Sequence, residues 1–376
     1  MMVVVGAVAA CVAYGNLVPT GGGGRVDGAA AWASPAADTG ARRLTIVASG
    51  DLLSHTSVLD QARSDAGGRG YDYGRMLGGV RPIIEEADLA ICHLETPVRA
   101  AGTDVDGAVP VFGAPEEIAV ELREVGYDRC SLASNHALDQ GAAGIDATLG
   151  AFDAAGLGHA GMGRDAAESG PSVFEVAGVT VAHLSASFDF NGFSPPPSEP
   201  WRTNLIDPAR IVTEARAARA AGAEVVIVSL HWGSEGSTEV IPEQRRVAEV
   251  LTASGAVDLI VGHHAHVVQP IEQVNGRWVV FGLGNQLSGM GDSTGCCDVR
   301  ALDGLMVRVE LTEQPDGTFA AGRPEAIPTY LGRHPYRVVP AVAAPTDPAL
   351  AAGVGVDELA ASVARTRAVV GDFVPP

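Results

Sequence analysis

From residue 41 onward, short apolar runs alternate with segments of helical periodicity, and this alternation predicts an α/β fold. Proline near the first residue of a helix and glycine just after its last residue, as at Pro208 and Gly222, is the usual arrangement. We expect helices at Pro115–Val125, Ala142–Ala155, Pro208–Ala221 and Pro242–Ser254. We expect strands at Leu44–Ala48, Leu89–His93, Cys130–Ala133, Val179–Leu184, Val225–Leu230, Leu259–Val261, Val279–Phe281 and Leu305–Leu311.

Composition divides the chain into three regions. Residues 1–40 contain the apolar stretch Met2–Ala13 and then Ala31-Trp32-Ala33, which fits the cleavage site of a signal peptide; the alternative is a disordered leader. Residues 41–340 hold the alternating pattern and form the expected main domain. Residues 341–376 are an Ala/Pro-rich tail with one helical stretch, Val356–Val369, and are either a peripheral appendage or a poorly ordered end.

The leader has a consequence for location. We expect a secreted or cell-envelope protein, with transient membrane association through the N-terminus, although a basic segment before the apolar stretch is missing. The alternative is a cytoplasmic protein with a disordered leader.

The charge of the chain restricts its partners. Against 25 basic residues stand 45 Asp and Glu, which gives a formal net charge of −20 over 376 residues. A surface this acidic repels phosphate backbones, so nucleic acid is excluded as a partner. The same acidic groups help to concentrate divalent cations near a site. The hydrophobic content of 47% excludes wholesale disorder.

The five cysteines do not form a disulfide framework in a chain of this length, and none has the Cys-x-x-Cys spacing of a thiolate zinc site. Cys92 and Cys130 lie inside apolar runs, where we expect them to be small buried hydrophobic residues. We do not predict a vicinal disulfide at Cys296 and Cys297.

Polar side chains follow directly after separate apolar runs, where ligands bind in open α/β sheets. Singly, each has a structural explanation: Asp51 or Asn135 as a turn or cap residue, Glu95 as a solvated carboxylate and His231 as a buried core histidine. His264 and His266 differ, because two residues at i and i+2 on an extended segment project to one side. The residues concerned are Asp51, Glu95, Asn135, His136, His231, His264 and His266.

This set of donors predicts a metal centre. Imidazole, carboxylate and carboxamide oxygen together suit Mn, Fe or Zn. Two divalent ions bridged by a carboxylate can share a hydroxide and bind a phosphoryl oxygen, and Glu95 is the best candidate for the bridge. His136 opens a helix where it can face a substrate, stabilise a developing charge or protonate a leaving group.

The motifs resemble those of the CapA family, whose members are linked to poly-γ-glutamate capsule synthesis and belong to the calcineurin-like metallophosphoesterase superfamily. The resemblance runs in order from about Leu44 to Leu311. It is carried by Ser49-Gly50-Asp51, Ala87-Asp88-Leu89, Leu94-Glu95-Thr96-Pro97, Ala133-Ser134-Asn135-His136-Ala137-Leu138-Asp139-Gln140-Gly141, Leu230-His231-Trp232-Gly233, Asp258-Leu259-Ile260-Val261-Gly262-His263-His264-Ala265-His266-Val267-Val268-Gln269-Pro270 and Phe281-Gly282-Leu283-Gly284-Asn285.

The resemblance implies a four-layer α/β/β/α sandwich of the metallo-dependent phosphatase type. It also implies roles for the site residues: His136 faces the substrate and Glu95 is shared by two metal ions. One ion would be held by Asp51 and His266, and the other by Asn135, His231 and His264.

Three positions depart from the pattern of the superfamily. The first motif is usually Asp-x-His, but here it is Asp51-Leu52-Leu53, with His55 displaced; His55 either replaces the missing ligand or contacts the substrate. Glu95 stands where most phosphoesterases have Asp. His93 stands where CapA relatives often have Asn, and it shares a face with Glu95, either as a ligand or as a partner that orients one.

Two functions follow from this set of residues. The first is a secreted metal-dependent hydrolase that acts on a phosphoester or amide-like bond, with an acidic or phosphorylated envelope polymer or a small phosphoester as substrate. The second is a non-catalytic capsule-assembly factor that binds an acidic polymer such as poly-γ-glutamate through its metal site. A purely structural zinc site is a weaker alternative, because such sites are closed and four-coordinate.

Overall fold

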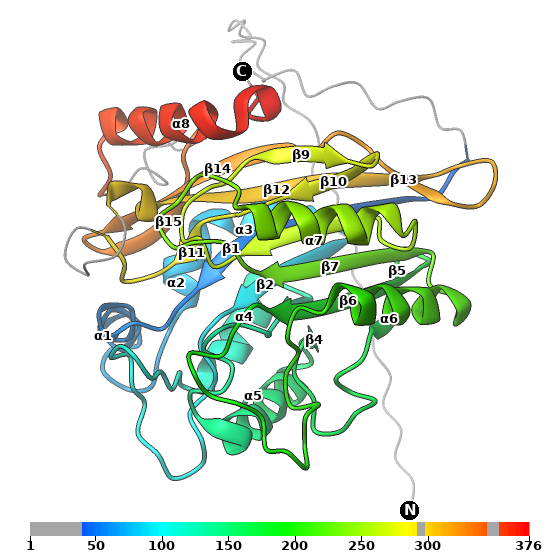
Figure 1. Cartoon of the computed structure of the whole chain (residues 1–376). Helices are drawn as coiled ribbons and strands as arrows, with labels where there is room; N and C mark the ends of the chain where they lie inside the picture. The colour runs from blue at the N-terminus through cyan, green and yellow to red at the C-terminus, as the bar shows by residue number, and fades with distance from the viewer. Residues whose placement is uncertain (1–39, 292–297, 344–352, 376) are drawn as a thin grey trace, which may run out of the picture. The chain divides into compact units, whose positions relative to one another are not determined.

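The apolar runs form two β-sheets in the computed structural model, which describes residues 40–291, 298–343 and 353–375 (Figure 1). The predicted signal peptide and the vicinal pair Cys296–Cys297 lie outside the described residues. Residues Ala41–Pro376 group as one compact unit.

The first sheet is built around parallel strands near the N-terminus. Its strand order is β15-β14-β12-β1-β2-β3-β4; β1 to β4 run parallel, whereas β12 is antiparallel to β1. Two short strands, β11 and β13, pair with β1 and β12. The strands are β1 (Arg43–Leu52), β2 (Leu89–Leu94), β3 (Arg129–Ser131), β4 (Gly158–Ala160), β11 (Asn285–Leu287), β12 (Asp303–Glu313), β13 (Phe319–Ala321), β14 (Glu325–Arg333) and β15 (Tyr336–Pro340).

The second sheet comes from the middle of the chain. Its strand order is β5-β6-β7-β8-β10-β9, and β6, β7, β8 and β10 run parallel. The strands are β5 (Ser172–Val176), β6 (Val179–Ser187), β7 (Val225–His231), β8 (Leu259–His263), β9 (Ile271–Val274) and β10 (Arg277–Val280).

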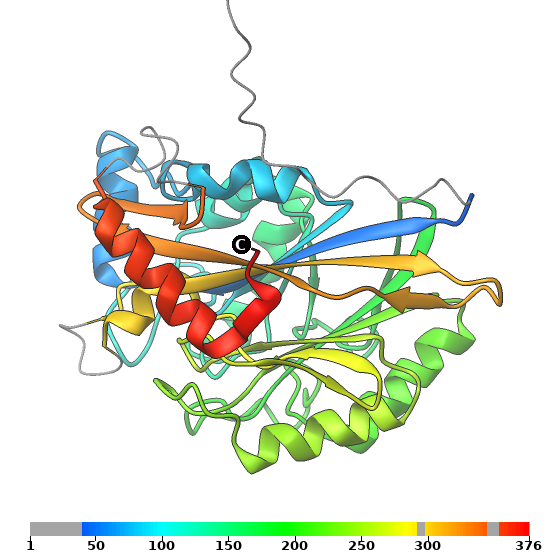
Figure 2. The ribbon, with the colours of Figure 1, turned by 90° about the horizontal axis from the view of Figure 1, so that it is seen from above.

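The two sheets pack face to face, with helices on both outer faces (Figure 2). Alternate residues of β1 show this: Ile46 packs between the sheets, whereas Val47 packs under the helices of the N-terminal half. The outer face of the first sheet is covered by α1 (Thr56–Asp65), α2 (Gly74–Leu77), α3 (Arg81–Glu85), α4 (Glu117–Val125) and α5 (Gly141–Ala155), and that of the second by α6 (Pro208–Ala220) and α7 (Pro242–Ala253). The predicted four-layer α/β/β/α sandwich is therefore confirmed.

The chain ends in a helix, α8 (Val356–Val370), that covers the helical stretch expected in the tail. It packs on β12 and β14, and Leu359 is fully buried. Arg365 donates two hydrogen bonds to the carboxylate of Asp303, and Tyr330 donates to Glu358. The described part of the tail is therefore an integral part of the fold, not a loose end. No helix among the described residues is long and apolar enough to cross a membrane.

The two cysteines in adjacent strands differ from the expectation. Cys92 and Cys130 are fully buried, as predicted, but they form a disulfide. They lie opposite one another in the register of β2 and β3, with Cα atoms 4.4 Å apart, so both side chains leave the same face of the sheet. The prediction of buried cysteines is confirmed, but the disulfide was not predicted because the sequence alone did not place these two strands side by side.

Candidate metal centre

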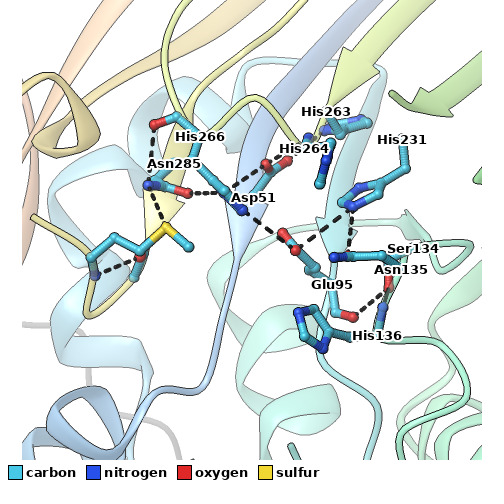
Figure 3. Close-up of polar contacts among 12 residues, drawn as sticks. Asp51, Glu95, Ser134, Asn135, His136, His231, His263, His264, His266 and Asn285 are labelled. Atoms are coloured by element: carbon cyan, nitrogen blue, oxygen red, sulfur yellow. Dashed lines mark hydrogen bonds and ion pairs between the residues drawn. The ribbon is translucent and has the colours of Figure 1, made fainter. Parts of the chain in front are cut away.

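The predicted ligands meet where strands of both sheets end (Figure 3). All of them are at least 95% buried, although each stands directly at or after an apolar strand. From the first sheet come Asp51 near the end of β1, Glu95 after β2 and Asn135 after β3; from the second come His231 at the end of β7 and His264 and His266 after β8. The strand pattern of the sequence thus brings together side chains that are far apart along the chain.

Two glycines beside the ligands permit this close approach. A Cβ atom on Gly50 would lie 2.2 Å from the carbonyl oxygen of Gly284, and one on Gly262 would lie 1.9 Å from that of Phe281. No side chain fits at either position. Glycine at these two positions therefore allows β1 and β8 to pack closely against residues 281–284. In this arrangement the backbone N–H of Asp51 donates to the carbonyl oxygen of Gly284 at 2.9 Å.

The loop after β8 carries its histidines on an unusual backbone. His264 and His266 have φ angles of 85° and 56°, in the left-handed region that non-glycine residues rarely adopt. The carboxylate of Asp51 holds this loop by accepting the backbone N–H of His264 at 2.9 Å. From the other side, Gly236 N–H donates to Ala265 O at 2.8 Å. Such strained residues occur where surrounding contacts over-determine them, typically at functional sites.

Glu95 is the electrostatic centre of the site. Both of its carboxylate oxygens are buried and neither has a hydrogen-bond partner among the described residues. Its Oε1 lies 3.7 Å from Nε2 of His231 and 3.7 Å from Nε2 of His266. Burial raises the pKa of Glu95 well above its ordinary value. A carboxylate in this position requires a positive charge beside it.

His266 presents a defined nitrogen to Glu95. Its Nδ1 lies 2.9 Å from Oδ1 of Asn285, whose amide group donates to His266 O and Ala301 O. Because both amide hydrogens are used in this way, Oδ1 accepts and Nδ1 of His266 donates, which leaves Nε2 toward Glu95. Burial alone would lower the pKa of His266, but Glu95 and Asp51 raise it to about 9.

On the other side of Glu95, His231 and Asn135 face each other. His231 Nε2 lies 2.9 Å from Asn135 Oδ1, and the amide of Asn135 donates to Asn191 Oδ1 at 3.3 Å. The ring of His264 lies 4.7 Å from that of His231, and its Nδ1 is buried without a partner. Oxygen and nitrogen atoms that can bind a cation thus lie close together beside Glu95.

Asp51 accepts several N–H groups at once. Its Oδ1 lies 2.9 Å from Nδ1 of His263, and its Oδ2 lies 3.4 Å from Nδ1 of His266, in addition to the backbone of the loop. Burial would raise the pKa of Asp51, but the hydrogen bonds from His263 and His266 hold it well below its ordinary value. Asp51 is therefore a carboxylate.

His136 lies beside Glu95 at the edge of the centre (Figure 3). Its Nδ1 lies 2.8 Å from Oδ2 of Asp139, which also accepts the backbone N–H of Phe112. Its Nε2 makes no hydrogen bond within the described part of the chain. A histidine oriented by a carboxylate in this way can take up or release a proton at Nε2.

The structure places His55 beside the centre, outside the clusters of possible ligands. Gly289 N–H donates to its Nδ1 at 3.2 Å, so the proton of a neutral ring lies on Nε2 and that nitrogen is a donor. The ring of Phe112 stands between His55 and His136, 5.1 Å and 4.7 Å from them. Burial lowers the pKa of His55 to about 4.

A loop that the sequence analysis did not connect with the site covers part of it. This loop follows β6, and the ring of Phe188 lies 4.5 Å from that of His264 while 45% of the side chain stays exposed. The side-chain oxygen of Asn191 accepts a hydrogen bond from the side-chain amide of Asn135. The amide nitrogen of Asn191 lies 3.4 Å from Nδ1 of His136. Phe188 and Asn191 both lie between β6 and α6, in a segment to which no site residue was assigned from the sequence.

Three further residues orient ligands or the catalytic candidate, and the sequence analysis did not assign them: His263, Asn285 and Asp139. All three stand inside quoted motifs, and His263 is the first of three histidines in four positions. The signal was present, but their partners could be found only in three dimensions.

Proximity alone defines three overlapping groups that could hold a metal ion. Their ligand atoms lie within 4.8 Å of one another. Donors bound to one ion at about 2.0–2.3 Å lie roughly 3–4 Å apart, so the spacing around Glu95 fits a divalent cation. The groups are Asp51, His93 and His263; His93, Glu95 and His231; and Glu95, His264 and His266. The arrangement suggests a metal centre.

The chain is similar in sequence to proteins of one known family. Residues 45–290, more than half of the chain, match the model of a family described as bacterial capsule synthesis protein PGA_cap. PGA biosynthesis protein CapA of Bacillus subtilis (strain 168) is 29% identical over 245 residues, 64% of this chain and 62% of that protein. Capsule biosynthesis protein CapA of Bacillus anthracis is 28% identical over 251 residues, 65% of this chain and 59% of that protein. The match spans less than two thirds of the length of either relative.

Two solved structures match this chain at low sequence identity. The calcineurin-like phosphoesterase YfkN of Bacillus subtilis has a TM-score of 0.47 at 13% identity, over 87% of this chain and 97% of that one. The NAD nucleotidase NadN of Haemophilus influenzae has a TM-score of 0.45 at 14% identity, over 87% of this chain and 56% of that one.

Proposed function

This chain belongs to the bacterial capsule synthesis protein family PGA_cap, and we propose that within this family it is a secreted, metal-dependent hydrolase of capsule or envelope polymer metabolism. The observation that carries the proposal is the buried carboxylate of Glu95, which faces Nε2 of His231 and of His266 at 3.7 Å without a hydrogen-bond donor of its own. Buried imidazole and carboxylate groups that lie this close together are typical of a cation-binding site and not of a hydrophobic core.

We propose two divalent ions, of Mn, Fe or Zn, with Glu95 between them. Asp51 and His266 would hold one, and Asn135, His231 and His264 the other. Bound ions of this kind act as Lewis acids and lower the pKa of a coordinated water. Asn285 and Asn191 orient His266 and Asn135 respectively, so their donor atoms point inward before any ion binds.

His136 is the proposed acid–base residue. Asp139 fixes its ring through Nδ1, which leaves Nε2 to give a proton to a leaving group or to hold one beside a developing oxyanion. His55 Nε2–H is a second donor on this side of the site, and we propose that it contacts the substrate and is not a ligand.

The proposed substrates are a phosphoester or an amide-like bond in an acidic or phosphorylated envelope polymer, or a small phosphoester. The net charge of −20 supports the exclusion of nucleic acid. The buried disulfide Cys92–Cys130 supports an extracytoplasmic location, because disulfides persist in oxidising compartments. Transient association with a membrane through the N-terminus is part of the same proposal.

The test of the hydrolase combines metal analysis with turnover. The purified protein is loaded with Mn or Zn, its bound metal is quantified, and it is assayed against phosphoesters and γ-glutamyl polymers. His136→Ala is expected to lower kcat by about 10²–10⁴-fold while the metal content stays at the wild-type value. His159→Gln, which changes a histidine of β4 outside the centre, is the matched control and should leave kcat unchanged.

A second function has its own support. The matched relatives are named as biosynthesis proteins, which favours a non-catalytic capsule-assembly factor that binds an acidic polymer through its metal ions. Metal-loaded wild type without turnover on any of these substrates, but with polymer binding that is lost in His266→Ala, would establish this alternative. Wild type without bound metal would refute both functions.

A further inference from the structure

His93 lies behind His231 in a chain of hydrogen bonds that leads away from the candidate metal centre. Its Nε2 lies 2.9 Å from His231 Nδ1, and its Nδ1 lies 2.8 Å from the hydroxyl oxygen of Ser131. The same hydroxyl lies 3.4 Å from the carbonyl oxygen of Cys92, to which it can donate. The chain thus begins at a proposed ligand and ends at the backbone of β2.

The strands hold this chain in place. His93 and Ser131 are paired in the register of β2 and β3, so their side chains leave the first sheet together. The ring of His93 is stacked on that of His263, with centroids 4.0 Å apart and an angle of 15° between the planes. His93, Ser131 and His231 are fully buried, so water does not compete for these hydrogen bonds.

The direction of each hydrogen bond follows from the need to bind a cation. His231 must present Nε2 without a proton, and a neutral imidazole then carries its proton on Nδ1. This Nδ1–H donates to His93 Nε2, so the proton of His93 lies on Nδ1 and is donated to Ser131. The hydroxyl of Ser131 then donates to Cys92 O.

Without a cation the same chain can run in the opposite direction. Ser131 then donates to His93 Nδ1, His93 Nε2–H donates to His231 Nδ1, and His231 Nε2–H donates to Asn135 Oδ1 at 2.9 Å. Both arrangements carry the same protons, one on each ring and one on the hydroxyl. The change of tautomer therefore leaves no buried donor unpaired and releases no net proton from the chain.

We propose that His93 is a positioning residue that holds His231 in its metal-binding tautomer, with Ser131 as the end of the chain, and that His93 is not itself a ligand. This inference rests on the proposed metal centre. Proximity places His93 in two of the three possible metal groups, but both of its ring nitrogens already have partners. In contrast, His264 Nδ1 and the oxygens of Glu95 have none among the described residues.

The experiment measures Zn²⁺ affinity of the full chain by competition with a chromogenic chelator. His93→Leu removes the acceptor for His231 and should weaken Zn²⁺ binding by about 10- to 100-fold. His93→Gln, whose Oε1 can accept the same hydrogen, should remain much closer to wild type. Ser131→Ala should weaken binding less than His93→Leu, because it removes only the last acceptor of the chain.

Ser229→Ala is the matched control. Ser229 forms the same kind of buried pair with a histidine, with His183 Nε2 2.9 Å from its Oγ, but this pair contacts none of the proposed ligands. Its loss should leave Zn²⁺ affinity at the wild-type value. A loss as large as that in Ser131→Ala would mean that the effect is general, and it would overturn the proposal.

Other results also decide the question. An equal loss in the Leu and Gln variants without a change in Ser131→Ala would identify His93 as a ligand. Nitrogen-15 NMR of the zinc-loaded wild type tests the inference without any variant, so it applies even if His93→Leu fails to fold. We expect both His93 and His231 to carry their proton on Nδ1. A proton on Nε2 of His93 would refute the inference. Wild type that binds no Zn²⁺ would refute the proposed centre itself.

Discussion

In the proposed metal centre, a proton and a divalent cation would compete for the space between His266 and Glu95. The Nε2 and Oε1 atoms are 3.7 Å apart, and the neighbouring carboxylates raise the pKa of His266 to about 9. Without a metal ion, the charge that Glu95 requires is supplied by protonation of this histidine. At the scale of single residues, the centre therefore links metal binding to pH.

This linkage predicts how the stability of the metal-free protein depends on pH. Because the pKa of His266 is raised from 6.5 to about 9 in the folded state, its stabilising contribution is fully present below pH 6.5. The contribution is lost as the pH rises through 9. The chelator-treated protein should therefore melt at a lower temperature at pH 9 than at pH 6.5, as measured by circular dichroism, whereas the metal-loaded protein should lack this His266-dependent decrease.

Glu95→Gln supplies the control for this prediction. The substitution removes the charge that raises the pKa of His266, so His266 should titrate well below pH 9 in an NMR titration and the stability difference between the two pH values should shrink. An unchanged pKa of His266 in this variant would contradict the assignment of Glu95 as its partner.

The clustering of the proposed ligands at the strand ends could be predicted, but the residues that contact and orient them could not. Asp51, Glu95 and His231 stand out in the sequence because each follows an apolar run and therefore marks a strand end. His263 and Asn285 act through partners, and Asp51 is 212 positions away from His263. Such a pairing depends on which strands become neighbours, and no local pattern carries that information.

At the scale of elements, the neighbouring strands β2 and β3 are joined by a disulfide as well as by their parallel pairing. These strands place Glu95 and Asn135, and the disulfide Cys92–Cys130 joins them across their shared register. The bond closes a segment with a sequence separation of 38. In the chain-entropy account, a crosslink of this length reduces the freedom of the unfolded chain and stabilises the fold by about 4 kcal/mol.

Removing this bond should therefore destabilise the protein strongly. Reduction with dithiothreitol is expected to lower the free energy of unfolding of the wild type by about 4 kcal/mol, measured by urea denaturation. The double variant Cys92→Ala, Cys130→Ala should be destabilised similarly and should not respond to dithiothreitol. A wild type that is insensitive to the reductant, with free thiols by chemical titration, would show that the cysteines are unpaired.

Long buried strands were predictable, and short or irregular elements were not. The central strands β6, β7 and β8 appear as continuous apolar runs because both of their faces are covered. β14 was not expected because it contains Pro328, a residue that normally argues against a strand inside a sheet. The helices α2 and α3 have 4 and 5 residues, too few for a helical periodicity to be recognised.

At the scale of the whole molecule, the centre lies where two sheets meet. The first sheet supplies Asp51, Glu95 and Asn135, and the second supplies His231 and the histidines after β8. An ion bound to both groups would tie the sheets together, in addition to the apolar layer between them. Metal binding should therefore stabilise the fold as a whole and not only the loops of the site.

Metal removal tests this directly. Addition of Zn²⁺ to the chelator-treated protein should raise its melting temperature, with a gain of about 2.7 kcal/mol when free Zn²⁺ is 100 times its dissociation constant. His266→Ala should lose most of this gain because it removes a donor from the second sheet. If Zn²⁺ binds to the wild type without any change in melting temperature, the ions do not couple the sheets.

The division of donors between the sheets also has a consequence for the biogenesis of the protein. Asp51, Glu95 and Asn135 are synthesised long before His264 and His266, and neither group alone completes the centre. A chain that is still emerging, or one cut between β4 and β5, holds only half of the donors. In the proposed centre, loading with metal would thus be a late event in the life of the polypeptide, and a bound ion would mark a chain that has been made at least as far as the loop after β8 and has brought the two sheets together.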